Sequence, residues 1–470
     1  MSDQQQLENR DGTYQSLLNQ QKKFFLSGAT KDIKNRAKAL KRLEKSIRKH
    51  EDEIFRALQK DLGRTPGTTF KIELGPLYHE LKYLKSKVKH VLKKQWAYTP
   101  AFMLPTRSRV KREPYGQVLL ISPWNYPVLL TFSPLAAAIS CGNTVVIKPS
   151  EISAATSAII QKVVDEALVS DWVSVVQGPA EESKKLLEQR WDYIFFTGST
   201  QVGRTIAQQA AKFLTPTTLE LGGKSPAIVT PSADLAVAAR RIIFGKFTNS
   251  GQTCVAPDYL YVHQDIKKDL IEQFKIELLK AFGEHPVESV DLNAIISHRH
   301  WVRLVKMIEN GKPLIGGGVD EGKLFIEPTL MDVDNWNHPS MAEEIFGPIL
   351  PVLTYNNYSK LLDEMRLREK PLSSYIFSSS KKEQDEFLDK IATGSTGIND
   401  CLIHVANHYL PFGGVGDSGS GSYHGKYSFE TFTHQKAIID NPTWIDLPFR
   451  YAPSTRLKDV LARLFMAIPW

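Results

Sequence analysis

The chain has 470 residues, of which 42% are hydrophobic and 23% are charged, and it carries a formal net charge of +8. At roughly 150 residues per domain, this length predicts two or three domains with buried cores, and the composition excludes a disordered or fibrous chain. The positive charge fits an anionic ligand, an anionic membrane or nucleic acid.

Most clustered basic residues lie near the N-terminus, in Lys22–Lys49 and Lys82–Lys94. The first stretch places Leu40, Leu43 and Ile47 at helical spacing between its lysines and arginines. This pattern predicts an amphipathic helix with a solvated basic face. Because no arginine-rich or aromatic RNA-binding motif accompanies the charge, we expect no nucleic acid partner.

The residues Met1 to Gly12 are polar, so we expect no secretory signal. No apolar run reaches the ~18 residues that would cross a bilayer, so we also expect no transmembrane segment. Three cysteines, Cys141, Cys254 and Cys401, are too few for a disulfide framework. We therefore expect a cytoplasmic location.

Short apolar runs alternate with helical stretches from residue 117 onward. The strands predicted in this half are Gln117–Ser122, Thr144–Lys148, Trp172–Val176 and Tyr193–Thr197. The helices predicted between and after them are Phe132–Ser140, Ala154–Leu168, Glu181–Glu188 and Val202–Lys212. Continuous apolar strands alternating with helices predict an α/β domain, in which helices cover both faces of a parallel sheet.

The same alternation starts again after residue 222. The strands predicted there are Ala227–Thr230, Tyr259–His263, Ile349–Tyr355 and Tyr375–Ser378. The predicted helices are Leu235–Phe247, Ile266–Phe282, Arg299–Asn310 and Lys381–Ile391. We therefore predict a boundary near Leu221–Lys224 between two α/β domains.

Three segments fit neither set of elements. Lys89–Arg112 is rich in proline, aromatic and basic residues, which favours a projecting hairpin. Gly413–Gly425 is dense in glycine and is expected to be irregular. Leu457–Ile468 predicts an amphipathic helix, whose apolar stripe must pack on the body, on a partner subunit or on a membrane surface.

Two residues have neighbours that suit covalent and acid–base chemistry. Cys254 follows small and polar residues, which give a thiol room to meet a substrate, whereas Cys141 and Cys401 resemble inert buried cysteines. Glu220 lies between leucines at an expected strand end, where partial desolvation raises the pKa of a carboxylate toward that of a general base. The alternative role for Glu220 is a salt bridge, for example to Lys224.

Further polar residues follow the predicted strands, and ligands bind at the carboxyl ends of strands in open α/β sheets. Asn125 follows the first strand and is either an oxyanion donor or a loop asparagine between two prolines. Lys148 and Glu151 lie at the end of the second strand and could hydrogen-bond the sugar hydroxyls of a nucleotide. Gly198 precedes the start of a helix, where free backbone amides could bind phosphate. A G-x-G-x-x-G motif is absent after the first strand. The histidines show no metal spacing, so we expect no metal.

Seven runs along residues 123–421 carry a resemblance, in the order PWNYP, KPSE, FTGSTQVG, LELGGKSP, GQTC, EEIFGP and PFGGVGDSGSG. Together they resemble the aldehyde dehydrogenase superfamily, and NSGQTCVAPDYL resembles its class 3 branch of fatty and aromatic aldehyde dehydrogenases. The resemblance implies two doubly wound parallel-sheet domains, one of them Rossmann-like, and a bridging β-hairpin. It assigns 1–88 and 113–220 to cofactor binding, 221–412 to catalysis, 89–112 and 413–445 to bridging, and 446–470 to a tail with an amphipathic helix.

The resemblance also implies a role for individual residues. Cys254 is expected to be the nucleophile, Glu220 the general base and Asn125 the oxyanion donor. The expected cofactor contacts are Trp124, Lys148, Glu151, Gly198, Ser199, Val202, Glu344 and Phe346. Three aromatic residues beside the motifs are expected to wall an apolar substrate pocket, namely Tyr126, Phe244 and Phe412.

These roles describe oxidation of an aldehyde to a carboxylic acid through a thiohemiacetal and a thioester on Cys254. Glu151 favours NAD over the 2′-phosphate of NADP, with NADP as an alternative. We expect medium- to long-chain aliphatic or aromatic aldehydes and a homodimer. A CoA-acylating dehydrogenase or an acyl-phosphate reductase needs no hydrolytic base, so Glu220 argues against both. A non-enzymatic relative of the same fold would have no reason to keep Cys254, Glu220 and Asn125 together.

Overall fold

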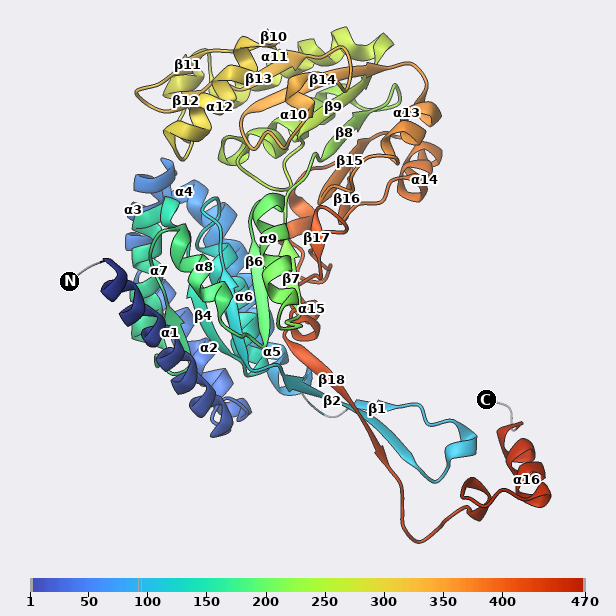
Figure 1. The fold of residues 1–470 in the computed structure, drawn as a ribbon. Helices are drawn as coiled ribbons and strands as arrows, with labels where there is room; N and C mark the ends of the chain where they lie inside the picture. The colour runs from blue at the N-terminus through green and yellow to red at the C-terminus, as the bar shows by residue number, and fades with distance from the viewer. Residues whose placement is uncertain (1–2, 92, 94, 468–470) are drawn as a thin grey trace.

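The computed structural model describes residues 3–91, 93 and 95–467. Two α/β bodies lie one above the other in Figure 1, and an arm projects from the lower body. The lower body is built on a six-stranded sheet, the upper body on a seven-stranded sheet and the arm on a three-stranded sheet.

The lower sheet has the strand order β17-β7-β6-β3-β4-β5. Its strands are β3 (Gln117–Ile121), β4 (Thr144–Lys148), β5 (Val173–Val175), β6 (Tyr193–Thr197), β7 (Thr217–Glu220) and β17 (Gly419–Ser420). All neighbouring pairs are parallel except β17 with β7. The chain order reverses between β3 and β6, and in doubly wound sheets a ligand crevice opens at such a point, beyond the carboxyl ends of the strands.

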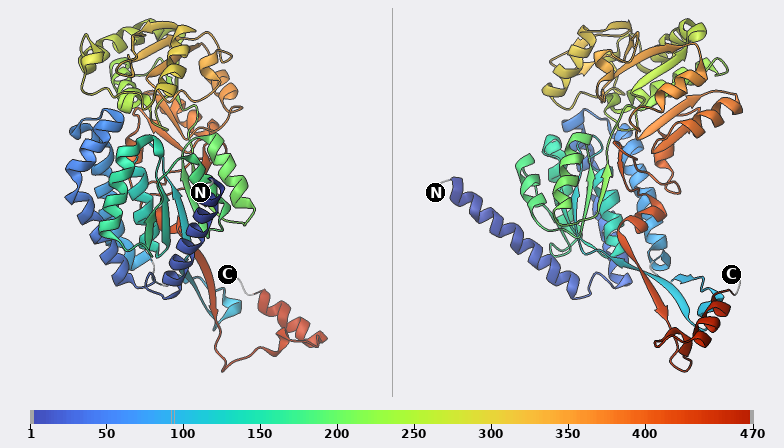
Figure 2. Two further views of the ribbon diagram at one scale, coloured as in Figure 1. Left: turned by 60° about the vertical axis from the view of Figure 1, so that its left-hand side comes forward. Right: turned by 45° about the vertical axis from the view of Figure 1, so that its right-hand side comes forward.

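Helices cover both faces of this sheet (Figures 1 and 2). They are α1 (Asp3–Leu26), α2 (Ile33–Lys49), α3 (Glu51–Leu62), α4 (Pro66–Thr69), α5 (Gly75–Val91), α6 (Leu129–Cys141), α7 (Ala154–Ala167), α8 (Ala180–Glu188) and α9 (Thr200–Ala211). The predicted amphipathic helix is confirmed in α2, because Leu40, Leu43 and Ile47 are fully buried in the core. The predicted helix Phe132–Ser140 begins three residues earlier, at Leu129.

The upper sheet has the order β10-β13-β14-β9-β8-β15-β16. Its strands are β8 (Pro226–Val229), β9 (Tyr259–His263), β10 (Lys312–Ile315), β13 (Thr329–Asp332), β14 (Ile349–Tyr355), β15 (Ser373–Phe377) and β16 (Ser395–Ile398). Its main helices are α10 (Leu235–Phe247), α11 (Lys267–Phe282), α12 (His298–Glu309), α13 (Tyr358–Met365) and α14 (Lys381–Lys390). The chain passes between the sheets after Glu220, so the predicted pair of parallel-sheet α/β folds is present.

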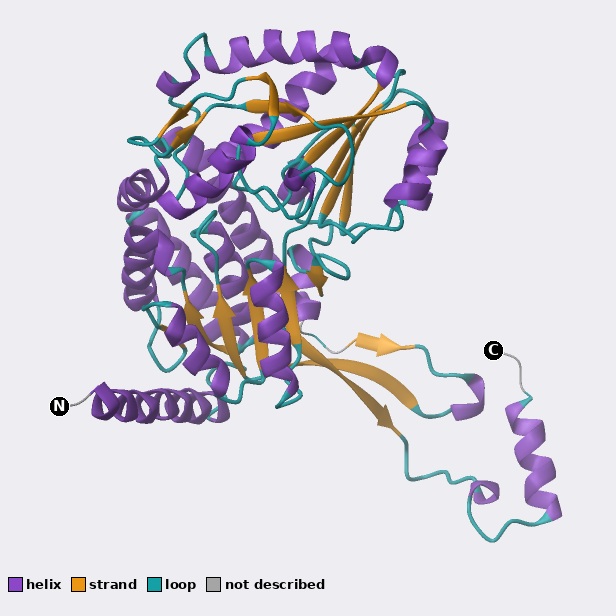
Figure 3. Cartoon of the chain, turned by 45° about the horizontal axis from the view of Figure 1, so that its top comes forward, coloured by secondary structure: helices purple, strands orange, loops and turns teal. Residues whose placement is uncertain are grey.

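The arm combines two distant parts of the chain (Figure 3). Its strands β1 (Gln95–Ala97) and β2 (Arg107–Pro114) form the hairpin predicted for Lys89–Arg112, and β18 (Thr433–Asp440) pairs with the other edge of β2. The expectation that Gly413–Gly425 is wholly irregular is wrong, because Gly419–Ser420 forms β17 against β7. Gly419 has φ +134°, and a side chain there would overlap the carbonyl of Leu219, so glycine permits this pairing.

The tail carries α16 (Arg456–Met466), which lies beyond the arm in Figure 1. Its residues Leu457, Leu461 and Leu464 are exposed, while Phe465 contacts Phe449 with ring centroids 5.3 Å apart. Ile468, which the sequence places on the same apolar stripe, lies outside the described residues. No helix in the described ranges is long and apolar enough to cross a membrane.

Candidate active site

The loop after β3 meets the segment that leads into Cys254. The side-chain amide Nδ2 of Asn125 donates to the carbonyl of Gln252 at 3.1 Å. The hydroxyl of Tyr126 lies 2.6 Å from Oγ1 of Thr253. Both contacts join the carboxyl edge of the lower sheet to the loop after α10 of the upper body, which places Asn125 beside the approach to Cys254.

The loop after α10 has an unusual backbone. Asn249 and Ser250 have φ values of 56° and 50°, in the left-handed region that most L-residues avoid. The side-chain amide of Asn249 donates to the carbonyls of Asn125 at 3.2 Å and of Gln252 at 3.0 Å. The hydroxyl of Ser250 donates to the carbonyl of Asn293 at 2.6 Å. These bonds hold the turn that delivers Cys254, and we call residues 249–254 the catalytic loop.

Cys254 is half-buried and is a free thiol. Burial, together with the charges of Glu344 and Glu220, raises its pKa to about 12, although the backbone amides of Cys254 and Val255 oppose the rise. The thiol is therefore protonated at neutral pH until a base takes its proton. The other two cysteines, Cys141 and Cys401, are fully buried in hydrophobic clusters.

Glu220 is the last residue of β7 and is only 2% exposed. Neither carboxylate oxygen has a hydrogen-bond partner among the described residues, and burial raises its pKa well above the usual value. The alternative salt bridge to Lys224 is wrong. That ammonium pairs with Asp258 and donates to the carbonyls of Ser340 at 3.0 Å and Glu343 at 2.9 Å. A buried carboxyl without a fixed partner is suited to accept a proton.

Two glycines let the segment around Glu344 approach the site. A side chain at Gly222 would overlap the carboxylate of Glu344, and one at Gly251, where φ is +72°, would overlap the carbonyl of Gly347. Three of the motifs found in the sequence are thus brought into contact. Burial, together with the charge of Asp258, raises the pKa of Glu344 to about 8.

Two aromatic rings extend this surface toward the loop after β3. Phe346 has φ 50° and packs against the edge of Trp124, with ring centroids 5.3 Å apart. Trp124 also contacts the ring of His300 at 5.6 Å. The contact between Trp124 and Phe346 therefore joins the loop after β3 to the segment that contains Glu344.

The remaining predicted cofactor residues share one edge of the lower sheet. Ile121 pairs with Lys148, and Thr197 with Glu220, so these strand ends are level. The ammonium of Lys148 donates to the carbonyl of Pro149 at 2.8 Å and lies 3.3 Å from a carboxylate oxygen of Glu151.

The turn after β6 begins helix α9. Ser199, which follows Gly198, caps α9 and accepts from the amide of Val202 at 3.4 Å. The first turn of α9 has no acidic residue, and Val202 is 48% exposed. A helix N-terminus with free amides, at the same carboxyl edge of the sheet as Lys148, fits the phosphates and ribose of a dinucleotide.

The predicted pocket aromatics separate into two groups. Tyr126 is buried beside the catalytic loop, and Phe412 is buried with its ring stacked 5.2 Å from that of His424. Phe412 also contacts Tyr423, whose pKa is raised by burial and by the charges of Glu220 and Cys254. Phe244 is instead 50% exposed on the last turn of α10. No ring contact within the described chain joins Phe244 to Tyr126 or Phe412.

Several residues near the centre escaped the sequence analysis. Tyr423 lies in the glycine-dense segment, where it looked like part of an irregular loop. Lys246 is fully buried within α10, and burial lowers its pKa to about 8. Arg64 and Glu73 form a buried ion pair behind Asn125. In the sequence, only Lys246 could have been noticed, because its position in a helical pattern predicts burial. The other residues act through contacts between segments that are far apart in the sequence. In the described ranges no group of His, Cys, Asp and Glu is arranged to hold a metal ion.

The chain is similar over most of its length to known proteins. The profile of the Aldehyde dehydrogenase family matches residues 12–438. The chain is 43% identical to the 4,4'-diaponeurosporen-aldehyde dehydrogenase of Staphylococcus aureus, over 90% of this chain and 93% of that protein. It is 41% identical to aldehyde dehydrogenase family 3 member H1 of Arabidopsis thaliana, over 94% and 93%.

Two further comparisons concern the cofactor and the fold. A dimeric NADP-preferring aldehyde dehydrogenase of Canis lupus familiaris is 40% identical, over 92% of this chain and 95% of that protein. The substrate-bound structure of Staphylococcus aureus AldH superposes with a TM-score of 0.94 at 40% identity, covering 96% of this chain and 99% of that chain. The chain therefore belongs to the aldehyde dehydrogenase family, within its family 3 branch, and is an NAD(P)-dependent oxidoreductase that acts on aldehydes.

Proposed function

We propose that this enzyme oxidises aldehydes to carboxylic acids through a thioester on Cys254. The observation that supports this most directly is the meeting of three groups at the catalytic loop. The Cys254 thiol feels the charges of Glu220 and Glu344, and the Asn125 amide is bonded two residues away, to the carbonyl of Gln252. A nucleophile, a base and an oxyanion donor are the groups that acyl chemistry needs.

The first step is removal of the thiol proton. Because the pKa of Cys254 is about 12 in the folded protein, a neighbouring buried carboxylate, Glu220 or Glu344, has to accept this proton. The thiolate then adds to the aldehyde carbonyl and forms a thiohemiacetal. The second N–H of the Asn125 amide and the backbone N–H of Cys254 stabilise the oxyanion.

The second step removes hydride from the former aldehyde carbon and leaves a thioester on Cys254. When bound, the nicotinamide cofactor supplies the hydride acceptor for this step. Once any proton that it took from Cys254 has passed to solvent, Glu220 takes a proton from water, and the resulting hydroxide attacks the thioester carbonyl. The C–S bond breaks, the carboxylic acid leaves, and the Cys254 thiolate takes up a proton. The free carboxylate oxygens of Glu220 and their raised pKa support this role.

For the cofactor we propose the residues at the strand ends of the lower sheet. Lys148 and Glu151 would hold the adenosine ribose, Ser199 and the start of α9 the phosphates, and Glu344 the nicotinamide ribose. Glu151 supports NAD as the preferred form, since a carboxylate repels a 2′-phosphate. Steady-state kinetics with NAD and NADP test this preference, and a higher kcat/KM with NADP would overturn it.

For the substrate we propose medium- to long-chain aliphatic or aromatic aldehydes. An apolar pocket is supported by the buried rings of Tyr126 and Phe412. It is also supported by the aldehyde in the name of the Staphylococcus aureus relative, 4,4'-diaponeurosporen-aldehyde dehydrogenase. A panel of aldehydes, followed by the absorbance of the reduced cofactor, tests the proposal. A higher kcat/KM for small charged aldehydes would contradict it, and formation of acyl-CoA on addition of CoA would contradict hydrolysis.

We further propose a cytoplasmic homodimer in which the arm bridges two subunits. Residues 1–88 and 113–220 would form the cofactor domain, 221–412 the catalytic domain, and 89–112 with 413–445 the bridge. The exposed edge strand β1, with Trp96 67% exposed, and the name of the dimeric canine relative support the dimer. The apolar stripe of α16 would then pack on the partner subunit, with peripheral membrane contact as the alternative.

A further inference from the structure

A fully buried arginine lies behind the oxyanion donor. Arg64 follows α3, where Gly63 ends the helix in a left-handed conformation, and its side chain has no exposed surface. Three guanidinium nitrogens reach three different elements. Nη1 pairs with the carboxylate of Glu73, Nη2 donates to the backbone carbonyl of Asn125, and Nε donates to Oδ1 of Asn249 at 3.0 Å.

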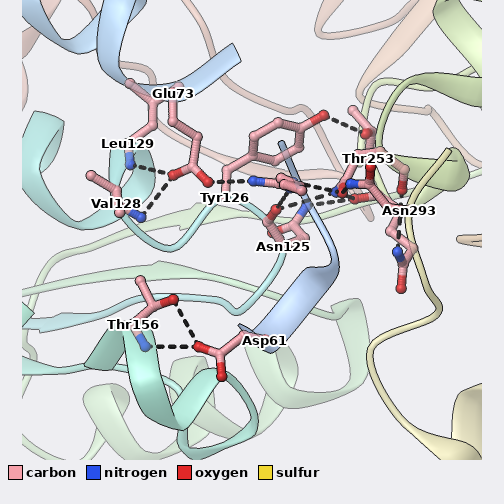
Figure 4. A network of polar contacts seen from close by, with 12 residues as sticks. Asp61, Glu73, Asn125, Tyr126, Val128, Leu129, Thr156, Thr253 and Asn293 are labelled. Atoms are coloured by element: carbon pink, nitrogen blue, oxygen red, sulfur yellow. Dashed lines mark hydrogen bonds and ion pairs between the residues drawn. The ribbon is translucent and has the colours of Figure 1, made fainter. Parts of the chain in front are cut away.

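Glu73 completes the connection on the other side (Figure 4). Its second oxygen accepts from the backbone amides of Val128 at 2.8 Å and Leu129 at 2.9 Å, at the start of α6. The carboxylate thus holds both the arginine and the helix that follows the PWNYP loop. Buried ion pairs persist when their remaining hydrogen-bonding groups are satisfied, as they are here.

Arg64 contacts two residues of the candidate active site, Asn125 and Asn249. Its bond to the Asn125 carbonyl fixes the peptide that follows the donor side chain. Its bond to Asn249 holds a side chain that also donates to the carbonyls of Asn125 and Gln252. These bonds fix the side chain of Asn249, whose backbone lies in the left-handed region with φ 56°. The Arg64 guanidinium also lies 4.8 Å from the ring of Tyr126.

We propose that the Arg64–Glu73 pair is a positioning element for catalysis. It holds the Asn125 amide and the left-handed catalytic loop in register, so that the oxyanion donor and the Cys254 sulfur face the same carbonyl. Arg64 touches neither reacting group and acts through Asn125 and Asn249. The inference rests on the roles proposed above for Asn125 and Cys254.

The test is a double-mutant cycle between Arg64 and Asn125. Arg64→Lys keeps a positive charge for Glu73, but one ammonium cannot span the three acceptors of the guanidinium. A misplacement on the order of 1 Å can cost about 100-fold in rate. We expect Arg64→Lys to slow the burst of reduced cofactor about 10-fold and Arg64→Met about 100-fold, with the KM for NAD changed less than about two-fold.

The decisive comparison uses the Asn125→Ala background. If Arg64 acts through the donor, adding Arg64→Lys to Asn125→Ala costs less than about three-fold, because coupled residues are not additive. Full additivity of the two effects would overturn the proposal. An unchanged burst in Arg64→Lys alone would overturn it as well.

Arg36→Met is the matched control. Arg36 is also buried among the N-terminal helices, where it donates to the carbonyl of Thr30 at 2.6 Å and contacts no site residue. We expect this variant to lower the thermal midpoint and leave the burst rate unchanged. Should Arg64→Met fail to fold, the Arg64→Lys cycle decides the question alone. Failure of the proposed function would look different, since the unmodified enzyme would then show no burst with aldehyde and NAD.

Discussion

At the residue scale, two buried carboxylic acids lie near the thiol of Cys254. Burial raises the pKa values of Cys254, Glu220 and Glu344 together, and each carboxylate makes ionisation of the thiol harder. The unliganded site therefore stores the nucleophile as a neutral thiol. Such a thiol resists oxidation and alkylation, because only the thiolate is a good nucleophile. Full reactivity requires the proton to move to a carboxylate.

Replacing the nucleophile tests this arrangement most simply. We expect Cys254→Ala to lower kcat for aldehyde oxidation by more than about 1,000-fold, since covalent capture is lost. The measurement is the absorbance of reduced cofactor under saturating substrate. Cys141→Ala is the control, because Cys141 is fully buried in the lower core and should change stability more than kcat. Retention of activity in Cys254→Ala would contradict the assignment.

The raised pKa of Glu220 also predicts a pH-dependent cost in stability. The folded protein holds the Glu220 proton more tightly than the unfolded chain does. The stability from this group is therefore complete below its unfolded pKa and is lost as the pH rises through the folded value. We expect the thermal midpoint of Glu220→Gln, minus that of the unmodified enzyme, to increase as the pH rises from about 5 to about 8. Parallel curves of midpoint against pH would contradict the raised pKa.

At the element scale, the apolar patterns in the sequence predicted many of the helices and strands, although β10, β13 and β16 were not among the predicted strands. Tyr259–His263, Ile349–Tyr355 and Leu235–Phe247 have the predicted bounds in the structure, because each is a largely apolar run flanked by polar residues or proline. The short strand β17 was missed, since its pairing uses backbone groups of glycine and no side-chain pattern.

The site was only partly predictable for a related reason. Cys254, Glu220 and Asn125 stand in local motifs that carry their chemistry in the sequence. Arg64 and Glu73 carry no local signal, because their partners lie 185 and 55 residues away along the chain. Contacts of that separation follow from how the elements pack, and a single sequence does not encode them in any short pattern.

The start of α9 offers a test of the cofactor assignment at this scale. Aspartate caps a helix as well as serine does, but its charge would repel a phosphate at the helix N-terminus. We expect Ser199→Asp to keep the thermal midpoint and raise the Kd of NAD at least about 10-fold, as measured by calorimetry. Ser380→Asp is the control, because Ser380 caps α14 in the same way. Equal NAD affinity in Ser199→Asp and the unmodified enzyme would exclude phosphate binding there.

The whole molecule places the candidate site between two bodies and sends an arm away from them. Asn125 and Glu220 come from the lower sheet, whereas Cys254 and Glu344 come from segments of the upper body. These four candidate site residues therefore all come from one chain. The arm leaves Trp96 and Ile439 exposed at 67% and 61%, which is unfavourable for an isolated subunit.

Replacing the exposed apolar residues of the arm with charged ones should therefore dissociate the proposed dimer. We expect the double variant Trp96→Asp, Ile439→Asp to shift the mass in light scattering from two chains to one. The unliganded Cys254 site should stay intact, as reported by the NAD affinity of the variant. Leu367→Asp is a control, because Leu367 is 84% exposed on the upper body, away from the arm. A monomeric unmodified enzyme would contradict the dimer.

The central claim is that Cys254 carries the acyl group which Glu220 releases. The measurement is the intact mass of Glu220→Gln after one burst with NAD and a long-chain aldehyde, followed by peptide mapping. We predict a mass increase equal to the acyl group, located on Cys254 and absent from the Cys254→Ala, Glu220→Gln double variant. A burst of reduced cofactor without any adduct on Cys254 would contradict the account.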